Sequence, residues 1–125
     1  MNMNVAIKIV CVFHLILICV TMFFCGYIMP HIEGYNPFYP DVDTEFSADF
    51  NEDLFQQIKI GDDTASVIKK IGHPLEIYEI NPEEYQWNYS IDGKCKWADF
   101  AWLIKAVIID KEGKVIKKAD TIAYD

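Results

Sequence analysis

The stretch "IKIGDDTASVIKKIGHP", residues 58–74, contains one short helix together with its start and stop signals. Gly61 interrupts the preceding chain, and Asp63 is placed to accept hydrogen bonds from the first backbone N–H groups of a helix. Val67 belongs to an apolar face that repeats every three or four residues. Gly72 supplies a left-handed stop, and Pro74 prevents continuation. We therefore expect a helix over residues 64–71, and we interpret these five residues as a structural motif, not a reaction centre.

The residues on either side of this helix change their hydrophobic period. Before it, Phe50, Leu54 and Ile58 recur every four residues, which is typical of a short amphipathic helix. After it the period becomes two: "YQWNYSI", residues 85–91, alternates large apolar or aromatic side chains with polar ones. We expect a half-buried antiparallel strand there and a shorter strand over residues 75–80.

The sequence of the C-terminal third predicts further strands. Asp92 and Gly93 predict a hairpin turn into a long strand within residues 95–110, which is apolar on both faces from Phe100 to Ile109 and should be central in the sheet. Residues 115–123 predict a lysine-containing edge strand. The predicted fold is α+β: an N-terminal transmembrane helix, then two short helices packed on a three- to four-stranded antiparallel sheet.

Residues 9–29 form an apolar run without a formal charge. As a helix the run is about 31 Å long, enough to cross the hydrocarbon core of a bilayer. It ends in Phe, Cys, Gly and Tyr and not in the small residues of a cleavage site, so we expect an uncleaved span. Lys8 precedes the span, whereas acids and no lysine follow it at once, which predicts a cytoplasmic N-terminus.

This interpretation divides the chain into four parts. Residues 1–8 are a cytoplasmic N-terminus, 9–29 the transmembrane helix, 30–49 a Pro-containing acidic linker, and 50–125 an extracytoplasmic α+β domain. The expected location is the cell membrane, crossed once, with the domain in the periplasm if the host has an outer membrane.

Charge and cysteine content exclude several function classes. The net charge is −8, and every acidic residue lies beyond residue 30, so nucleic acid is not an expected partner. Cys95 is the only cysteine after the apolar run, and no Cys and His spacing is typical of a zinc site. No phosphate-binding loop or nucleophile–base order is present. We therefore predict no enzyme activity, catalytic residue, metal or cofactor.

Aromatic residues are the candidate partner-binding groups. Such side chains dominate protein interfaces, but half or more of them must fill the core of so small a domain. The sequence leaves open which are core and which are interface. The candidates are Trp87, Tyr89, Trp97 and Trp102.

Residues 50–120 resemble the SmpA/OmlA or BamE-like family, small proteins associated with outer-membrane protein assembly. The resemblance rests on Gly61, on Val67 six residues later, on Ile-Gly-His-Pro at 71–74, on Trp-Asn-Tyr at 87–89, and on the closing "IIDKEGKVIK", 108–117. It implies a fold related to that of beta-lactamase inhibitor proteins. Members tied to assembly are typically lipoproteins, whereas this chain carries an apolar span.

Two functions follow as hypotheses. The first is a membrane-anchored, non-enzymatic scaffold or binding protein whose domain contacts another envelope or membrane protein, with residues 9–29 in the lipid bilayer. The alternative is an inhibitor-like protein that blocks an extracytoplasmic enzyme, with a loop such as 92–94 entering a cleft.

Overall fold

The computed structural model describes residues 3–28, 36 and 38–124. It begins with an apolar helix, α1 (Met3–Phe23), which continues as one π-helical segment (Phe24–Ile28). The folded domain follows. Its helices and strands are β1 (Thr44–Phe46), α3 (Glu52–Gln56), α4 (Thr64–Ile71), β2 (Glu76–Asn81), β3 (Glu84–Asn88), β4 (Ser90–Asp92), β5 (Trp102–Asp110) and β6 (Val115–Ala123).

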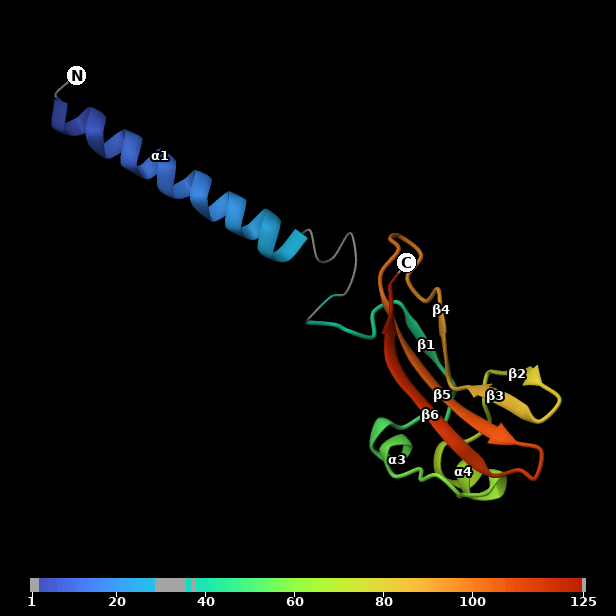
Figure 1. Cartoon of the computed structure of the whole chain (residues 1–125). Helices are drawn as coiled ribbons and strands as arrows, with labels where there is room; N and C mark the ends of the chain where they lie inside the picture. Colours follow the sequence, from blue (N-terminus) through green and yellow to red (C-terminus); the bar gives the residue numbers. More distant parts are fainter. Residues whose placement is uncertain (1–2, 29–35, 37, 125) are drawn as a thin grey trace.

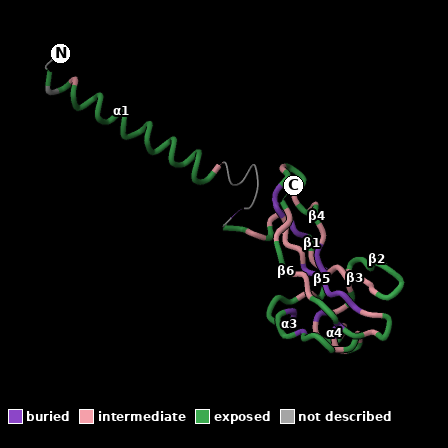
Figure 2. The backbone as a smooth tube through the Cα atoms, viewed as in Figure 1, coloured by how far each residue is buried: buried purple, intermediate pink, exposed green. Residues whose placement is uncertain are grey.

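The apolar helix is long enough and apolar enough to span a membrane. The qualifying segment is Val5–Ile28, 24 residues, and none of it is buried against the rest of the chain. Figure 2 shows α1 almost wholly exposed. The expected span, 9–29, starts later and ends at a residue outside the described ones. A membrane anchor and a signal sequence both have this character.

The domain is α+β, as predicted. Its main sheet has four antiparallel strands in the order β2-β3-β5-β6, and β1 and β4 form a second, two-stranded sheet. The predicted central strand is β5, which lies between β3 and β6. In Figure 1, α3 and α4 lie together at one end of the domain, whereas the β4–β5 connection and the C-terminus lie at the other.

Three boundaries differ from expectation. The strand expected over 85–91 is divided at Tyr89 into β3 and β4, because β4 pairs with β1 and leaves the main sheet. The strand expected within 95–110 begins only at Trp102, so residues 93–101 form a long connection instead of a tight hairpin at Asp92 and Gly93. β1 lies inside the segment expected to be a linker, and the folded domain therefore begins before residue 50.

The core lies between the two short helices and the inner face of the sheet. Figure 2 shows buried positions along β5 and on parts of α3 and α4. The buried cluster consists of Phe55, Ile58, Val67, Ile71, Tyr89, Val107, Ile109 and Val115. These side chains come from the two helical segments, from Tyr89 between β3 and β4, and from β5 and β6, so their burial fixes the helices on the sheet.

The motif of residues 61–74 frames α4 as predicted. Asp63 accepts a hydrogen bond from the Ser66 N–H at 2.8 Å, and Val67 is completely buried. Gly72 has φ +74° and ψ −163°, a region open essentially to glycine alone, and half-buried Pro74 follows it. The Gly61 N–H also donates to the Val115 carbonyl at 2.7 Å, which ties the start of the motif to the start of β6.

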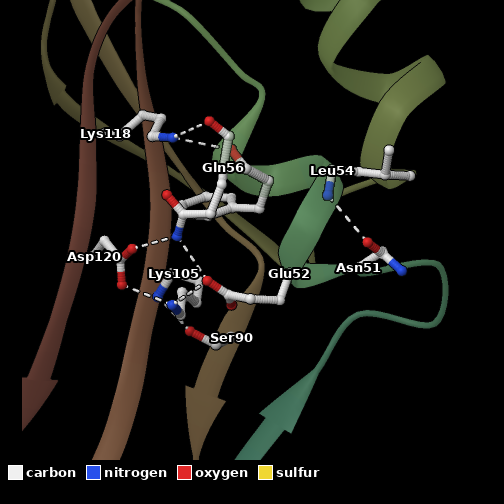
Figure 3. A network of polar contacts seen from close by, with 9 residues as sticks. Asn51, Glu52, Leu54, Gln56, Ser90, Lys105, Lys118 and Asp120 are labelled. Carbon is white, nitrogen blue, oxygen red and sulfur yellow. Dashed lines mark hydrogen bonds and ion pairs between the residues drawn. The ribbon is translucent and has the colours of Figure 1, made fainter.

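A buried lysine fastens α3 to the sheet, although we expected β5 to be apolar on both faces. Lys105 is almost completely buried, and its Nζ lies 2.9 Å from Glu52 Oε1 and 2.7 Å from Asp120 Oδ1. Gln56 donates to the same two carboxylates (Figure 3). Burial alone would lower the pKa of Lys105, but the hydrogen bonds to Asp120 and Glu52 outweigh it and raise that pKa.

Candidate functional site

The four predicted partner-binding aromatics do not form one surface. Tyr89 is completely buried, and its hydroxyl donates to the Gly72 carbonyl at 3.1 Å, so it is a core residue and unavailable to a partner. Burial raises the pKa of its phenol. Trp87 is half-buried and packs against the core cluster. Trp102 is half-buried beside Ala123, at the end where β6 finishes.

Trp97 is the one member of that group with a largely exposed side chain, 71%. It lies in the connection between β4 and β5, and its ring meets the buried Phe100 ring edge-on at a centroid distance of 5.1 Å. In a domain with a small core, large apolar side chains are needed in the interior, so an indole exposed on a loop indicates a contact surface. Trp97 is therefore a candidate contact residue.

A second exposed surface is the outer edge of the main sheet, formed by β2. One side of β2 pairs with β3, and the other side has no strand neighbour among residues 3–28, 36 and 38–124. All six β2 residues are exposed, with Ile77 at 57%, Tyr78 at 51% and Ile80 at 50%. We call Glu76–Asn81 the open edge. It presents apolar side chains beside backbone groups that lack a strand partner.

The open edge is also acidic. The chain has no lysine or arginine between Lys70 and Lys94, whereas Glu76, Glu79, Glu83 and Glu84 all lie in the β2–β3 hairpin. Among these, Glu83 forms an ion pair with Lys111. Glu76 accepts a hydrogen bond from the Tyr78 hydroxyl at 2.6 Å, which raises the pKa of that phenol. A negative field therefore surrounds the open edge.

The opposite edge of the sheet, β6, is protected against further pairing. It carries Lys117 and Lys118, as the sequence predicted for an edge strand. Lys118 donates to the Phe55 and Gln56 carbonyls of α3 at 3.0 and 3.3 Å. The two edges thus differ: β6 carries lysines and is tied to α3, whereas β2 carries glutamates beside exposed apolar side chains.

Asp43 holds the Trp97 loop in place. Its side-chain oxygens accept hydrogen bonds from the Cys95 N–H at 2.8 Å and the Phe100 N–H at 2.9 Å. Its backbone carbonyl accepts from Gly93 and Lys94, both at 3.2 Å. Asp43 is 1% exposed, so these bonds form in a desolvated setting where loss of a partner is costly. The loop is therefore fixed to the segment that precedes β1.

Three carboxylates gather at the same place. Oxygens of Asp43, Asp92 and Asp99 lie within 4.8 Å of one another. Burial and the charges of Asp43 and Asp99 raise the pKa of Asp92. Both Asp43 side-chain oxygens already accept backbone N–H groups, so loop anchoring accounts for the position of Asp43 in spite of the repulsion between the three carboxylates.

An apolar cavity of about 430 Å³ lies beside this loop. Its walls come from the end of the apolar segment and from the folded domain. The lining residues include Tyr27, Ile28, Tyr39, Val42, Trp97 and Phe100. The cavity places the Trp97 loop at the end of the domain that faces the apolar helix.

Sequence reasoning missed Asp43 and the open edge for different reasons. In the sequence Asp43 is one of several acids of the expected linker. The backbone N–H groups that bind its side chain, those of Cys95 and Phe100, lie more than fifty positions away. The strand that forms the open edge was expected, but its position at the edge was not. The lysine-free stretch between residues 71 and 93 was a usable signal.

No family of known proteins, no curated protein and no solved structure matches this chain. Its function must therefore be argued from the two exposed surfaces themselves.

Proposed function

We propose that this chain is a membrane-anchored, non-enzymatic protein-binding component of the cell envelope. The apolar helix stays in the membrane, the N-terminus is cytoplasmic, and the domain binds an extracytoplasmic segment of a neighbouring envelope protein. The similarity to BamE-like assembly components stays part of this proposal. It is supported by the order of two short helices followed by antiparallel strands.

The open edge of β2 is the observation that carries the proposal. An extended polypeptide added to such an edge gains main-chain hydrogen bonds, and alternate side chains supply specificity. Natural edge strands are normally blocked by lysines, proline or a covering element, because an unblocked edge pairs with other chains. β6 carries Lys117 and Lys118, whereas the open edge carries Glu76, Glu79 and an irregularity between Glu79 and Asn81. The glutamates disfavour pairing with an acidic strand but not with a basic one.

The charge around the open edge selects the chemistry of the partner. Glu76 and Glu79, the glutamates of β2 itself, favour a segment that carries Lys or Arg, because opposite charges on adjacent strands attract. A second copy of this chain would bring two such strands together and would be repelled. We therefore propose an extended basic segment of a different protein as the added strand.

The inhibitor alternative assigns binding to the loop at residues 92–94. In the structure the Gly93 and Lys94 N–H groups donate hydrogen bonds to the Asp43 carbonyl. The neighbouring Trp97 lines a cavity together with residues at the end of the apolar segment. These contacts orient the loop toward the chain's own anchor, which favours the open edge as the protein-binding surface.

Site-specific photocrosslinking in the host tests the proposal. A photoreactive side chain at Ile77 or Tyr78 should give one adduct with an envelope protein, whereas the same group at Lys117 on β6 should give none. Glu79→Lys should reduce the adduct more than Glu79→Gln, because reversal of charge repels a basic segment and neutralisation only removes the attraction.

Three results would refute the proposal. They are equal adducts at the Lys117 control, an adduct with a second copy of this chain, and identical effects of Glu79→Lys and Glu79→Gln.

A further inference from the structure

We propose that the end of the domain that carries Trp97 docks onto the surface of the bilayer, so that the domain lies against the membrane. We call this surface the aromatic end and define it by Tyr39, Trp97 and Tyr124, all largely exposed. This inference rests on the proposed role of the apolar helix as an anchor. The occupant that we assign to the surface is the lipid headgroup region.

The length of the connection places this end at the membrane. Ile28 is the last described residue of the apolar segment. Eight residues later Asn36 is already buried, and its Oδ1 accepts from the Phe38 and Tyr39 N–H groups at 3.0 and 3.3 Å. Eight residues span at most about 28 Å when fully extended. The Phe38 ring also lies 6.3 Å from the Tyr27 ring. The aromatic end therefore cannot move far from the bilayer surface.

The opposite end of the domain is occupied by α3 and α4 (Figure 1). The loop with Trp97 and the C-terminal end of β6 lie together at the aromatic end. Trp and Tyr are the side chains most enriched at membrane–water interfaces, because an apolar ring enters the headgroup layer while its N–H or O–H stays in polar surroundings. The exposed residues of the aromatic end have this chemistry.

The hydrogen bonds of Asp43 hold the aromatic end in one conformation before it contacts lipid. They join the Trp97 loop to the segment that follows Tyr39, so the two parts of the surface are presented together. A loop that is already ordered loses little conformational entropy when it binds. The apolar residues that line the cavity, including Trp97 and Ile28, extend the apolar surface of the aromatic end toward the headgroup layer.

The local charge permits contact with lipid although the domain is acidic. Lys94 and Lys96 precede Trp97 in the same loop. They offset part of the negative charge of Asp43, Asp92 and Asp99, which gather beside this loop. The net charge of the whole chain is −8. Docking should therefore occur on zwitterionic lipid and weaken as anionic lipid is added at low salt, the reverse of a polybasic surface.

Fluorescence of the full chain in phosphatidylcholine vesicles tests the inference. The Trp97 signal is the difference between the wild-type chain and Trp97→Phe. In the presence of vesicles the emission of Trp97 should be blue-shifted. It should be shielded from acrylamide in the water and quenched by lipid that carries a nitroxide near the headgroup. The matched Trp87→Phe difference reports a core-packed indole and should be insensitive to the lipid quencher. Replacing half of the lipid by phosphatidylglycerol should weaken the quenching of Trp97 at low salt.

The outcomes separate docking from anchoring. Quenching of Trp97 by acrylamide but not by lipid, in chains that float with the vesicles, would refute docking and leave the anchor intact. Shielding from both quenchers would also refute docking, because protein would then cover Trp97. Chains that fail to float would refute the anchor and docking together.

Discussion

Replacement of Gly72 by Ala should destabilise the domain through two separate effects. The backbone at φ +74° and ψ −163° strains any residue with a Cβ, which costs about 1–3 kcal/mol. A Cβ at this position would also lie 2.6 Å from the Asp49 Cβ, so the chain must shift. We take the cost of this shift as about 1–2 kcal/mol, within the range for overpacking. Allowing for the lower entropy of the unfolded alanine chain, about 0.4–1 kcal/mol, we expect a net loss of about 1–4 kcal/mol.

Gly61→Ala is the matched control. Gly61 has φ +93°, but an added Cβ would meet nothing within 4 Å, so only the backbone strain applies. We expect its loss to be smaller by about 1–2 kcal/mol. For a domain of this size each kcal/mol corresponds to about 4–8 °C in Tm.

The assay is thermal unfolding of the full chain in detergent micelles, followed by near-ultraviolet circular dichroism so that the apolar helix does not dominate the signal. A double-mutant cycle with Asp49→Gly isolates the steric effect, because that change removes the Asp49 Cβ. Asp49→Gly should reduce the cost of Gly72→Ala. Equal Tm losses for Gly72→Ala and Gly61→Ala, or no coupling in the cycle, would refute the reasoning.

Three further predictions concern charge and topology. Burial opposes ionisation of Asp120, but its bonds to Lys105 and Gln56 outweigh this and lower its pKa below 3.8, so its stabilising effect is present above about pH 4 and is lost as pH falls further. The Tm of Asp120→Asn should therefore lie below wild type at pH 7, and the difference should shrink as the pH falls through the lowered pKa of Asp120; a constant difference would contradict this. The pKa of Asp92 is raised, mainly by burial and then by Asp43 and Asp99, so its ionised form is penalised in the fold. Asp92→Asn should raise the Tm at pH 7, with a gain that shrinks toward pH 4, and a lower Tm at pH 7 would exclude this repulsion. In inverted membrane vesicles the domain should resist added protease until the vesicles are opened; cleavage in intact vesicles would reverse the proposed topology.

The helix α4 was predictable because its signals are local. Asp63 and Gly72 act within one or two turns of it, and the observed bounds, Thr64–Ile71, equal the expected ones. The main sheet was predictable for a similar reason, since the alternation in residues 85–91 and the long apolar run to Ile109 are both local signals. Local signals also explain why β5 was correctly placed in the interior of the sheet.

Long-range polar contacts account for what the sequence did not reveal. β1 was not predicted because it lies in an acidic stretch: the buried residues there are Thr44 of β1 and the preceding Asp43, whose partners lie beyond residue 90. Lys105 interrupts an apolar run and is nevertheless buried, because Glu52 and Asp120 reach it from other elements. Tyr89 lies on the apolar face of the alternating stretch 85–91, but the sequence left open whether it was core or interface; in the fold it is buried where the chain leaves the main sheet. Such positions depend on the assembled fold.

Backbone amide hydrogen exchange tests the central claim, strand addition at the open edge, most directly. The measurement compares the free chain with the chain isolated together with its crosslinked partner. We predict that residues 76–81 become protected in the complex, while protection of 115–123 in β6 is unchanged. Unchanged exchange across 76–81 in a partner-bound chain would contradict the account.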